Sequence, residues 1–240
     1  MFIKPNWPLP SNIHSISTTR HGGVSLKPYD SFNLAMHVDD NNGDVSKNRQ
    51  MLIDKLQLPA DPIWINQIHG KTVLKASEIH REKDADSTFT DEPYQVCVVL
   101  TADCLPVLIS DRNGKKVAAV HCGWRGLQKK ILTETLSKLQ IPADETLVWF
   151  GPAISAKVYE VGTEVRENFM DDTNAFVENG PKKWLCNLYQ IARNELHRNG
   201  ISAIFGGEYC TFTQKDQFFS YRRDGAATGR MATLIWFDES

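Results

Sequence analysis

Six short apolar runs rich in β-branched residues constrain the fold of this 240-residue chain more than any other feature. Each run is bounded by turn-forming residues, which is typical of buried β-strands. The predicted strands span residues 63–67, 72–76, 95–101, 105–110, 116–121 and 146–150. Asn113-Gly114 lies between the fourth and fifth runs and is a hairpin signal, so we expect these two strands to be antiparallel neighbours.

Apolar residues at helical spacing lie between and after these runs. They predict helices over residues 45–58, 127–139 and 183–198, and a fourth helix that begins near Thr163. Locally paired strands with interspersed helices indicate an α+β protein rather than a repeated strand–helix–strand unit. The sequence has no internal repeat and no long linker. We therefore expect one domain over residues 1–240, an α+β sandwich with a mixed β-sheet and flanking helices.

The composition is that of an ordinary globular protein. Hydrophobic residues make up 41% of the chain, charged residues 23%, and the net charge is −2. This balance favours neither nucleic acid nor a membrane as a partner and leaves a small molecule as the expected ligand. Prolines interrupt the opening "MFIKPNWPLP", and no run reaches the roughly 18 apolar residues of a membrane span. We expect a cytoplasmic protein that is a monomer or a weak homodimer.

The five cysteines are scattered along the chain and odd in number, so reduced thiols are expected rather than a disulfide framework. Cys97 lies inside an apolar run, and we expect it to pack as a small buried hydrophobe. Cys122 follows His121, and adjacent residues of a strand point to opposite faces. Only one of these two can face a site, and we expect it to be His121. Burial is also the favoured prediction for Cys186 and Cys210.

Three candidate metal ligands lie at the ends of predicted strands: His69, Cys104 and His121. They are 35 and 17 residues apart, which excludes a local zinc finger or ribbon, so the fold itself would have to assemble the site. Two imidazoles and one thiolate leave a coordination position open, which is typical of catalytic zinc. Zn²⁺ is the expected ion and copper the alternative. The competing interpretation is that these residues are ordinary core or surface residues.

Arginines provide a second element of a candidate site. Arg125 lies between two glycines in "HCGWRG" and just before a predicted helix, where backbone N–H groups and a guanidinium suit an anion such as phosphate. Arg222 and Arg223 lie in the turn "SYRRDG" and are further candidates to bind substrate. A solvated or ion-paired surface turn is the alternative for each cluster.

Five other polar or aromatic residues are weaker candidates. Asn33 and His37 have the spacing to reach one side of an extended segment and could bind substrate, although turn hydrogen bonding is the alternative. Asp86 is a candidate catalytic acid or base. Tyr221 could stack on a base, as could Phe32, although either could be core.

Several segments of this chain resemble the YfiH family, also called the laccase-domain, polyphenol oxidase or peptidoglycan-editing-factor family. The matching segments are "TTRHGGVS", "FNLAMHVDD", "QIHG", "TADCLPVLISD", "VAAVHCGWRGL", "GPAIS", "YEVG" and "FFSYRRDGAATGRMA". They follow the family's order from about residue 18 onward. The resemblance implies that His69, Cys104 and His121 are zinc ligands. It also implies a purine nucleoside enzyme that phosphorolyses adenosine, inosine and methylthioadenosine and deaminates adenosine.

The oxidase name can be tested against the histidine content. A multicopper laccase needs a histidine-rich trinuclear cluster, usually with H-x-H pairs, in addition to its electron-entry copper. This chain has seven histidines and no H-x-H pair. It could hold a single copper at the candidate site, so single-copper polyphenol oxidation remains only as an alternative.

Two further alternatives use the same residues differently. In an amidase that edits UDP-linked muropeptide precursors, Cys104 would be a nucleophile activated by a neighbouring imidazole, or the metal would serve instead. In a protein that only binds a ligand or a partner, replacing Cys104 would leave the biological activity intact. Metal content and the sensitivity of activity to alkylation would separate these hypotheses.

Overall fold

The computed structural model describes residues 1–79 and 83–239 and has two β-sheets packed face to face. The four-stranded sheet is antiparallel and has the order β1 (Phe2–Ile3), β2 (Ile13–Thr18), β13 (Met231–Phe237) and β5 (Cys97–Thr101). The six-stranded sheet has the order β12 (Ile204–Gly206), β8 (Thr146–Phe150), β6 (Leu105–Asp111), β7 (Val117–Cys122), β4 (Ser87–Thr90) and β3 (Val73–Lys75). It is mixed, because β12 pairs with β8 and β3 with β4 in parallel.

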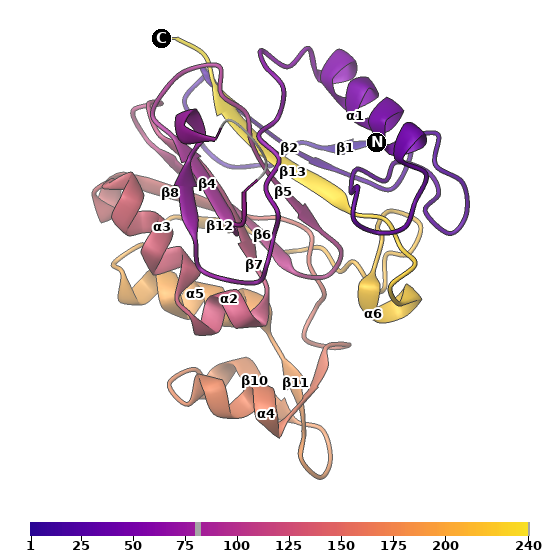
Figure 1. Ribbon diagram of the computed structural model, residues 1–240. Coiled ribbons are helices and arrows are strands. Elements are labelled where there is room, and N and C mark those ends of the chain that lie inside the picture. The colour runs from indigo at the N-terminus through magenta and orange to yellow at the C-terminus, as the bar shows by residue number, and fades with distance from the viewer. Residues whose placement is uncertain (80–82, 240) are drawn as a thin grey trace.

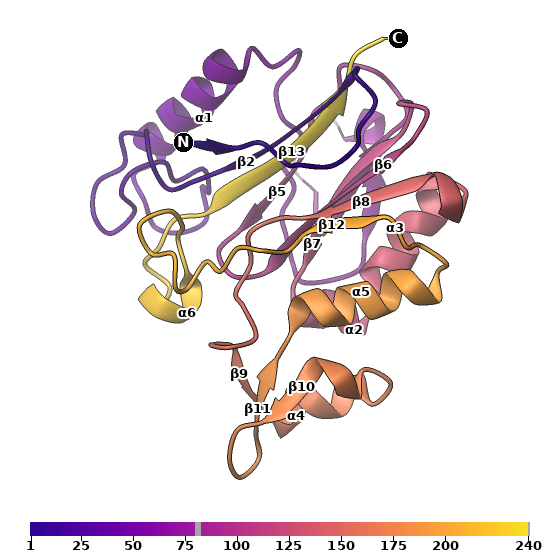
Figure 2. The ribbon, with the colours of Figure 1, turned by 180° about the vertical axis from the view of Figure 1, so that it is seen from behind.

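Helices cover the two outer faces of this sandwich (Figure 1). Helix α1 (Asn42–Leu56) lies against the four-stranded sheet. Helices α2 (Trp124–Gln128), α3 (Ile131–Leu139) and α5 (Leu188–Arg198) lie against the six-stranded sheet, as the reverse view also shows (Figure 2). The predicted α+β sandwich with a mixed sheet and flanking helices is confirmed.

Strand alternation divides the core into layers. Along β5, Val98 and Leu100 pack with Leu52 of α1, whereas Val99 packs between the sheets with Leu108 of β6. Successive side chains of a strand point to opposite faces, so a strand that is apolar at every position can serve two layers at once. The continuous apolar runs of the sequence therefore correspond to strands that have a buried core layer on each face.

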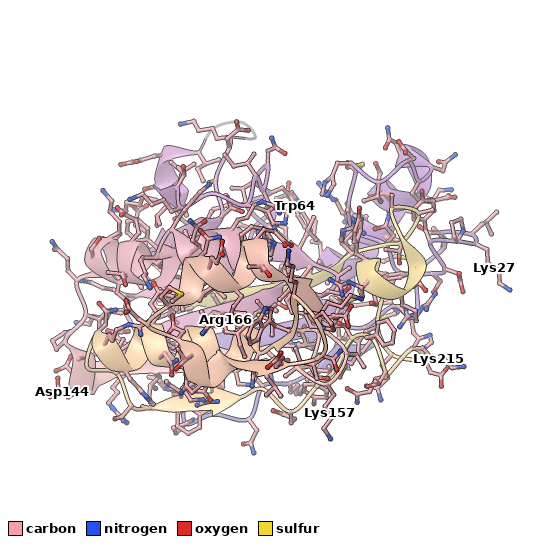
Figure 3. The ribbon with its side chains drawn as sticks, turned by 90° about the horizontal axis from the view of Figure 1, so that it is seen from below. Lys27, Trp64, Asp144, Lys157, Arg166 and Lys215 are labelled. Carbon is pink, nitrogen blue, oxygen red and sulfur yellow. The ribbon has the colours of Figure 1, made fainter. Side chains whose placement is uncertain are left out.

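A small third sheet lies at the bottom of Figure 1, and its buried residues belong to the same hydrophobic cluster as those of the six-stranded sheet and of α3 and α5. Its strands have the order β10 (Phe176–Glu178), β11 (Lys183–Cys186) and β9 (Glu160–Gly162), and α4 (Thr163–Arg166) follows β9. Figure 3 views the molecule from this side and labels Arg166, whose guanidinium lies 5.0 Å from the ring centre of Phe176 and 5.6 Å from that of Trp184. Short 3₁₀ turns at residues 76–78, 143–145, 167–169 and 173–175 and the one-turn helix α6 (Tyr221–Asp224) complete the described elements.

Five of the six predicted strands are confirmed, and the predicted antiparallel pairing of the 105–110 and 116–121 runs is present as β6 and β7. The predicted strand at 63–67 is wrong. That segment makes only isolated bridges at Ile63 and Asn66. The side chain of Gln67 forms hydrogen bonds with the backbone N–H and C=O of Leu100.

The helix predictions hold in part. The helix predicted at 45–58 is confirmed as α1, and a helical turn begins at Thr163 as expected. The 127–139 segment is divided, because Lys130 has a left-handed backbone with φ of 62° between α2 and α3. The prediction of one helix over 183–198 is wrong at its start: residues 183–186 form β11, and α5 begins after Asn187, which accepts a capping hydrogen bond from the Gln190 N–H.

Within the described residues, the helices are too short or too polar to cross a membrane.

Candidate functional site

Three potential metal ligands converge at one end of the sandwich. His69 lies in the irregular segment before β3, Cys104 lies between β5 and β6, and His121 lies near the end of β7. Their ligand atoms all lie within 4.8 Å of one another. Cys104 Sγ is 3.8 Å from His69 Nε2, and the rings of His69 and His121 are nearly perpendicular, with centres 4.7 Å apart. The fold thus brings together the three residues singled out from the sequence.

Side chains alternate between the two faces of β7, so that His121 joins this cluster and Cys122 points to the opposite face. Cys122 is fully buried among Leu105, Leu127 and Ile131 on the face of the six-stranded sheet that the helices cover. Cys97 and Cys186 are also fully buried, and Cys210 is 9% exposed. The predicted burial of these cysteines is confirmed, and all five are free thiols.

Asp86 holds two of the candidate ligands in place. Its side chain is fully buried, and its Oδ1 accepts hydrogen bonds from His121 Nδ1 at 2.8 Å and from the His69 backbone N–H at 2.9 Å. The Gly70 N–H donates to its Oδ2 at 2.5 Å. Burial raises the pKa of Asp86, but the hydrogen bond and charge of His121 and the two N–H donors outweigh it and lower the pKa. Asp86 lies behind His121 and orients the two candidate histidine ligands, while its predicted role as a catalytic acid or base stays a prediction.

The same cluster favours a thiolate. Burial raises the pKa of Cys104, but the charge of His121 and hydrogen bonds from His121 and His69 lower it to about 6. Burial lowers the pKa of His121, but the thiolate and Asp86 raise it above its usual value. The opposite directions of these two pKa shifts favour a Cys104 thiolate beside a protonated His121.

The donor set fits a single zinc ion. With Zn–S of about 2.3 Å and Zn–N of about 2.0 Å, tetrahedral geometry places S and N roughly 3.6 Å apart, close to the 3.8 Å between Cys104 and His69. The Nδ1 of His121 donates to Asp86, which leaves Nε2, on the side of Cys104, as the atom that can ligate an ion. A carboxylate behind a histidine in this way is the usual support of a zinc ligand.

The backbone of the "HCGWRG" segment must pass close to two of these residues. A side-chain carbon built on Gly123 would lie 2.9 Å from His69 Cδ2 and 3.1 Å from Cys104 Sγ. Glycine is therefore required for steric reasons, since its φ of −73° is open to any residue. The next residue begins α2.

The cluster opens into a pocket of about 520 Å³, a size typical of small-molecule sites. Four predicted substrate-binding residues lie on its wall: Arg125, Arg222, His37 and Tyr221. The wall also contains Arg230, from the same arginine-rich segment as Arg222, and four residues that the sequence did not single out for a site role: Gln67, Asp103, Trp124 and Tyr159.

Two predicted substrate-binding residues do not line this pocket. Asn33 is fully buried, and its side chain accepts from the backbone N–H of Arg230 and donates to Asp40. Arg223 donates to the carbonyls of Thr211, Phe212 and Phe218 and pairs with its neighbour Asp224. Both side chains make hydrogen bonds within the fold, and the pocket wall is formed without them. Phe32, the other stacking candidate, is fully buried in the core.

Two guanidinium groups separate this pocket from a second hollow of about 650 Å³ beside the small sheet. Arg125 stacks on the ring of Trp124 at 4.3 Å. Arg222 stacks on Tyr159 at 4.9 Å and donates to the Glu160 carbonyl at 2.7 Å. All four of these stacked residues line both hollows. Within the part of the chain that the structure describes, neither arginine pairs with a carboxylate, so both are available to an anion.

The missed residues were hidden from sequence analysis because their roles depend on distant partners. Gln67 makes two hydrogen bonds to the backbone of Leu100, 33 residues away. Asp103 binds a segment more than 100 residues further along the chain. An aspartate next to a candidate ligand was the one available signal, in the segment "TADC".

Fold and site together define an α+β sandwich protein with a candidate metal centre of two imidazoles and one thiolate. A model of the family described as multi-copper polyphenol oxidoreductase laccase matches residues 14–238. This chain belongs to that family.

Close relatives carry a different functional name. A Haemophilus influenzae protein named purine nucleoside phosphorylase is 48% identical over 98% of this chain and 99% of its own. An Escherichia coli protein named purine nucleoside phosphorylase YfiH is 48% identical over 98% of each chain. Among solved structures, a Neisseria meningitidis DUF152 protein matches 99% of both chains with a TM-score of 0.96 and 45% identity. Bacillus licheniformis YfiH matches 94% of this chain and 93% of its own, with a TM-score of 0.90 and 27% identity.

Proposed function

We propose that this protein is a zinc-dependent purine nucleoside phosphorylase that acts on adenosine, inosine and methylthioadenosine. The observation that carries the proposal is the presence, in one pocket, of the His69/Cys104/His121 cluster and the two unpaired guanidinium groups of Arg125 and Arg222. The names of the close relatives support the substrate class.

Phosphorolysis forms a bond between a phosphate oxygen and C1′ of the ribose as the bond from C1′ to the base nitrogen breaks. The electron pair of that bond leaves with the base, which then takes up a proton. Arg125 and Arg222 would neutralise and orient the phosphate, which is the group that must approach C1′ in line. Trp124, Tyr159 and Tyr221 offer aromatic surface for the purine.

His69, Cys104 and His121 would hold the ion, and Asp86 would keep His69 and His121 in position. A bound Zn²⁺ supplies a Lewis acid and a source of hydroxide near neutral pH, which is also what deamination of adenosine requires. We include adenosine deamination as a second activity of the same pocket. A single ion is supported because, within the described chain, these three residues form the one cluster able to share an ion, whereas multicopper oxidation needs additional copper sites.

One observation favours an alternative. The lowered pKa of Cys104 favours its thiolate form, and a thiolate beside an imidazole can attack an amide. An amidase acting on UDP-linked muropeptide precursors would use this nucleophile only without the ion, because a metal-bound thiolate has already donated its electron pair.

The deciding experiment incubates protein of measured metal content with adenosine, with and without phosphate, and identifies the products by mass. We expect adenine and ribose 1-phosphate only when phosphate is present, inosine where deamination occurs, and hypoxanthine where that inosine is then phosphorolysed. Cys104→Ala should abolish metal binding and lower turnover by about 100-fold or more, since metal catalysis contributes several kcal/mol. Cys186→Ala is the matched control, because Cys186 is a buried thiol that does not line the pocket.

Two results would contradict the proposal. One is unchanged adenosine with metal-loaded protein. The other is activity that is highest in metal-free protein and is abolished by alkylation, which would favour the amidase.

A further inference from the structure

Asp103 lies directly before Cys104 and is almost fully buried. Its carboxylate accepts three hydrogen bonds: Thr211 Oγ1 donates to Oδ1 at 2.6 Å, and Ser220 Oγ and the Arg222 backbone N–H donate to Oδ2 at 3.0 and 2.6 Å. Its backbone has φ of 97°, which an L-residue other than glycine rarely adopts. A side chain is kept at this position despite the backbone strain, which indicates that the carboxylate is needed there.

The three donors come from one segment that ends on the pocket wall. Ser220 is also the N-cap of α6, where its side chain accepts from the Arg223 N–H. The first two residues of α6 are Tyr221 and Arg222, and both line the pocket. The carboxylate of Asp103 therefore fixes the start of α6 relative to the loop that carries Cys104.

Arg222 is consequently held at both ends. Asp103 binds its backbone N–H, while the Glu160 carbonyl binds its Nη1 and Tyr159 stacks on its guanidinium. The remaining guanidinium nitrogens stay available on the wall shared by the two hollows. A cation held in this way loses less conformational entropy when it binds an anion.

We propose that Asp103 is a positioning residue that ties Arg222 to the Cys104 loop, so that phosphate binding in the pocket depends on it. The inference rests on the proposed phosphorylase function. It goes beyond that function because Asp103 would hold Arg222 in position for phosphate without itself contacting phosphate.

Asp103→Asn and Asp103→Gly make the sharpest comparison. Asn tolerates a positive φ, its Oδ1 can accept from Ser220 and Arg222, and its Nδ2 can donate to the Thr211 hydroxyl. Gly relieves the backbone strain but removes every acceptor. We expect Asp103→Gly to raise KM for phosphate about tenfold, which corresponds to about 1.4 kcal/mol, with smaller changes in kcat and in KM for the nucleoside. Asp103→Asn should restore most of the affinity.

The control variant is Ser17→Ala, which removes a buried hydrogen bond to Thr233 between β2 and β13, away from the pocket. It should lower thermal stability without a selective effect on phosphate. Metal content should be unchanged in all three variants. Equal changes in both KM values, no change in Asp103→Gly, or loss of metal from Asp103→Gly would overturn the proposal.

A second readout does not depend on turnover. Phosphate binding to the metal-loaded wild type and to the Asp103 variants is measured by calorimetry, and we expect weaker binding to Asp103→Gly than to wild type and Asp103→Asn. If wild type binds phosphate but does not turn over nucleosides, the proposed function fails while this comparison still tests the role of Asp103. Absence of phosphate binding to wild type would overturn both.

Discussion

Gly123 shows how closely single residues constrain the candidate metal centre. The position is glycine because His69 and Cys104 occupy the space that a side chain would need. The sequence raised the question of why two glycines flank Trp124 and Arg125. The structure answers it for Gly123 by steric exclusion, which no pattern in the sequence could reveal.

We expect Gly123→Ala to weaken metal binding strongly while the protein remains folded. The added methyl group would displace His69 or Cys104 by a few tenths of an ångström or more, which disturbs a site that demands well-defined ligand distances. Metal affinity measured by competition with a chromophoric chelator should fall by at least about tenfold, a loss typical of disturbed ligand support. Gly43→Ala, at the exposed start of α1, is the control and should retain metal. Unchanged affinity in Gly123→Ala would show that the loop can adjust.

At the residue scale, sequence reasoning succeeded where a local rule applied. Strand alternation placed His121 and Cys122 on opposite faces, and the tendency of a cysteine to pack as a small hydrophobe assigned Cys122 to the core. The burial of Cys122 confirms this assignment. Sequence reasoning did not reveal the partners of Asn33 and Arg223, whose polar groups bind backbone atoms of other segments, in the case of Asn33 197 residues away. Such partners cannot be read from one sequence without the fold.

At the scale of elements, α3 depends on a carboxylate from another helix. Glu195 of α5 is 1% exposed, and its Oε1 accepts from the backbone N–H and the hydroxyl of Thr133 in the first turn of α3. Its Oε2 has no hydrogen-bond partner among the described residues. Burial raises the pKa of Glu195, although the Thr133 hydrogen bonds oppose the shift.

The buried carboxyl group of Glu195 makes the free energy of unfolding depend on pH. Because its pKa is raised in the folded state, the folded protein binds more protons than the unfolded chain, and stability falls as pH rises above about 4.3 through the folded pKa. Gln keeps an acceptor for Thr133 and does not titrate. The free energy of unfolding of wild type relative to Glu195→Gln should therefore decrease between pH 5 and pH 8 in urea titrations. A difference that is constant or grows with pH would contradict this account.

Whether a strand could be predicted from the sequence depended on how apolar its residues are. Continuous apolar strands such as β5, β6, β7 and β8 were found, whereas β2 ("IHSIST") and β4 ("STFT") were missed. These two are rich in serine and threonine, yet Ser87 and Thr88 are fully buried, and the Thr88 hydroxyl has no hydrogen-bond partner among the described residues. β13 ("MATLIWF") carried a clear apolar signal and was overlooked.

At the scale of the whole molecule, the two-sheet layering follows from contacts that no local pattern encodes. Hairpin chemistry predicted one strand pair, but the four-stranded sheet joins β2 and β13, whose paired residues lie more than 200 positions apart. The candidate metal centre is a product of this layering, since its three residues lie in separate segments.

Metal binding should consequently stabilise the entire fold. The unfolded chain has no preformed site, so an ion that binds only the folded state raises stability by about 2.7 kcal/mol at 100 times its dissociation constant. Treatment with a chelator should lower the melting temperature, and added Zn²⁺ should restore it. His121→Ala should melt at a temperature that is nearly independent of Zn²⁺. Equal responses of wild type and this variant would place the ion elsewhere.

The position of β13 bears on how the molecule is made. This strand follows all other described elements in the chain, yet it lies between β2 and β5 in the four-stranded sheet. The strands of the six-stranded sheet, all within residues 73–206, leave the ribosome earlier and can pair first. Until β13 has been synthesised, β2 and β5 each keep one strand edge without its final partner, and such open edges can pair with other chains.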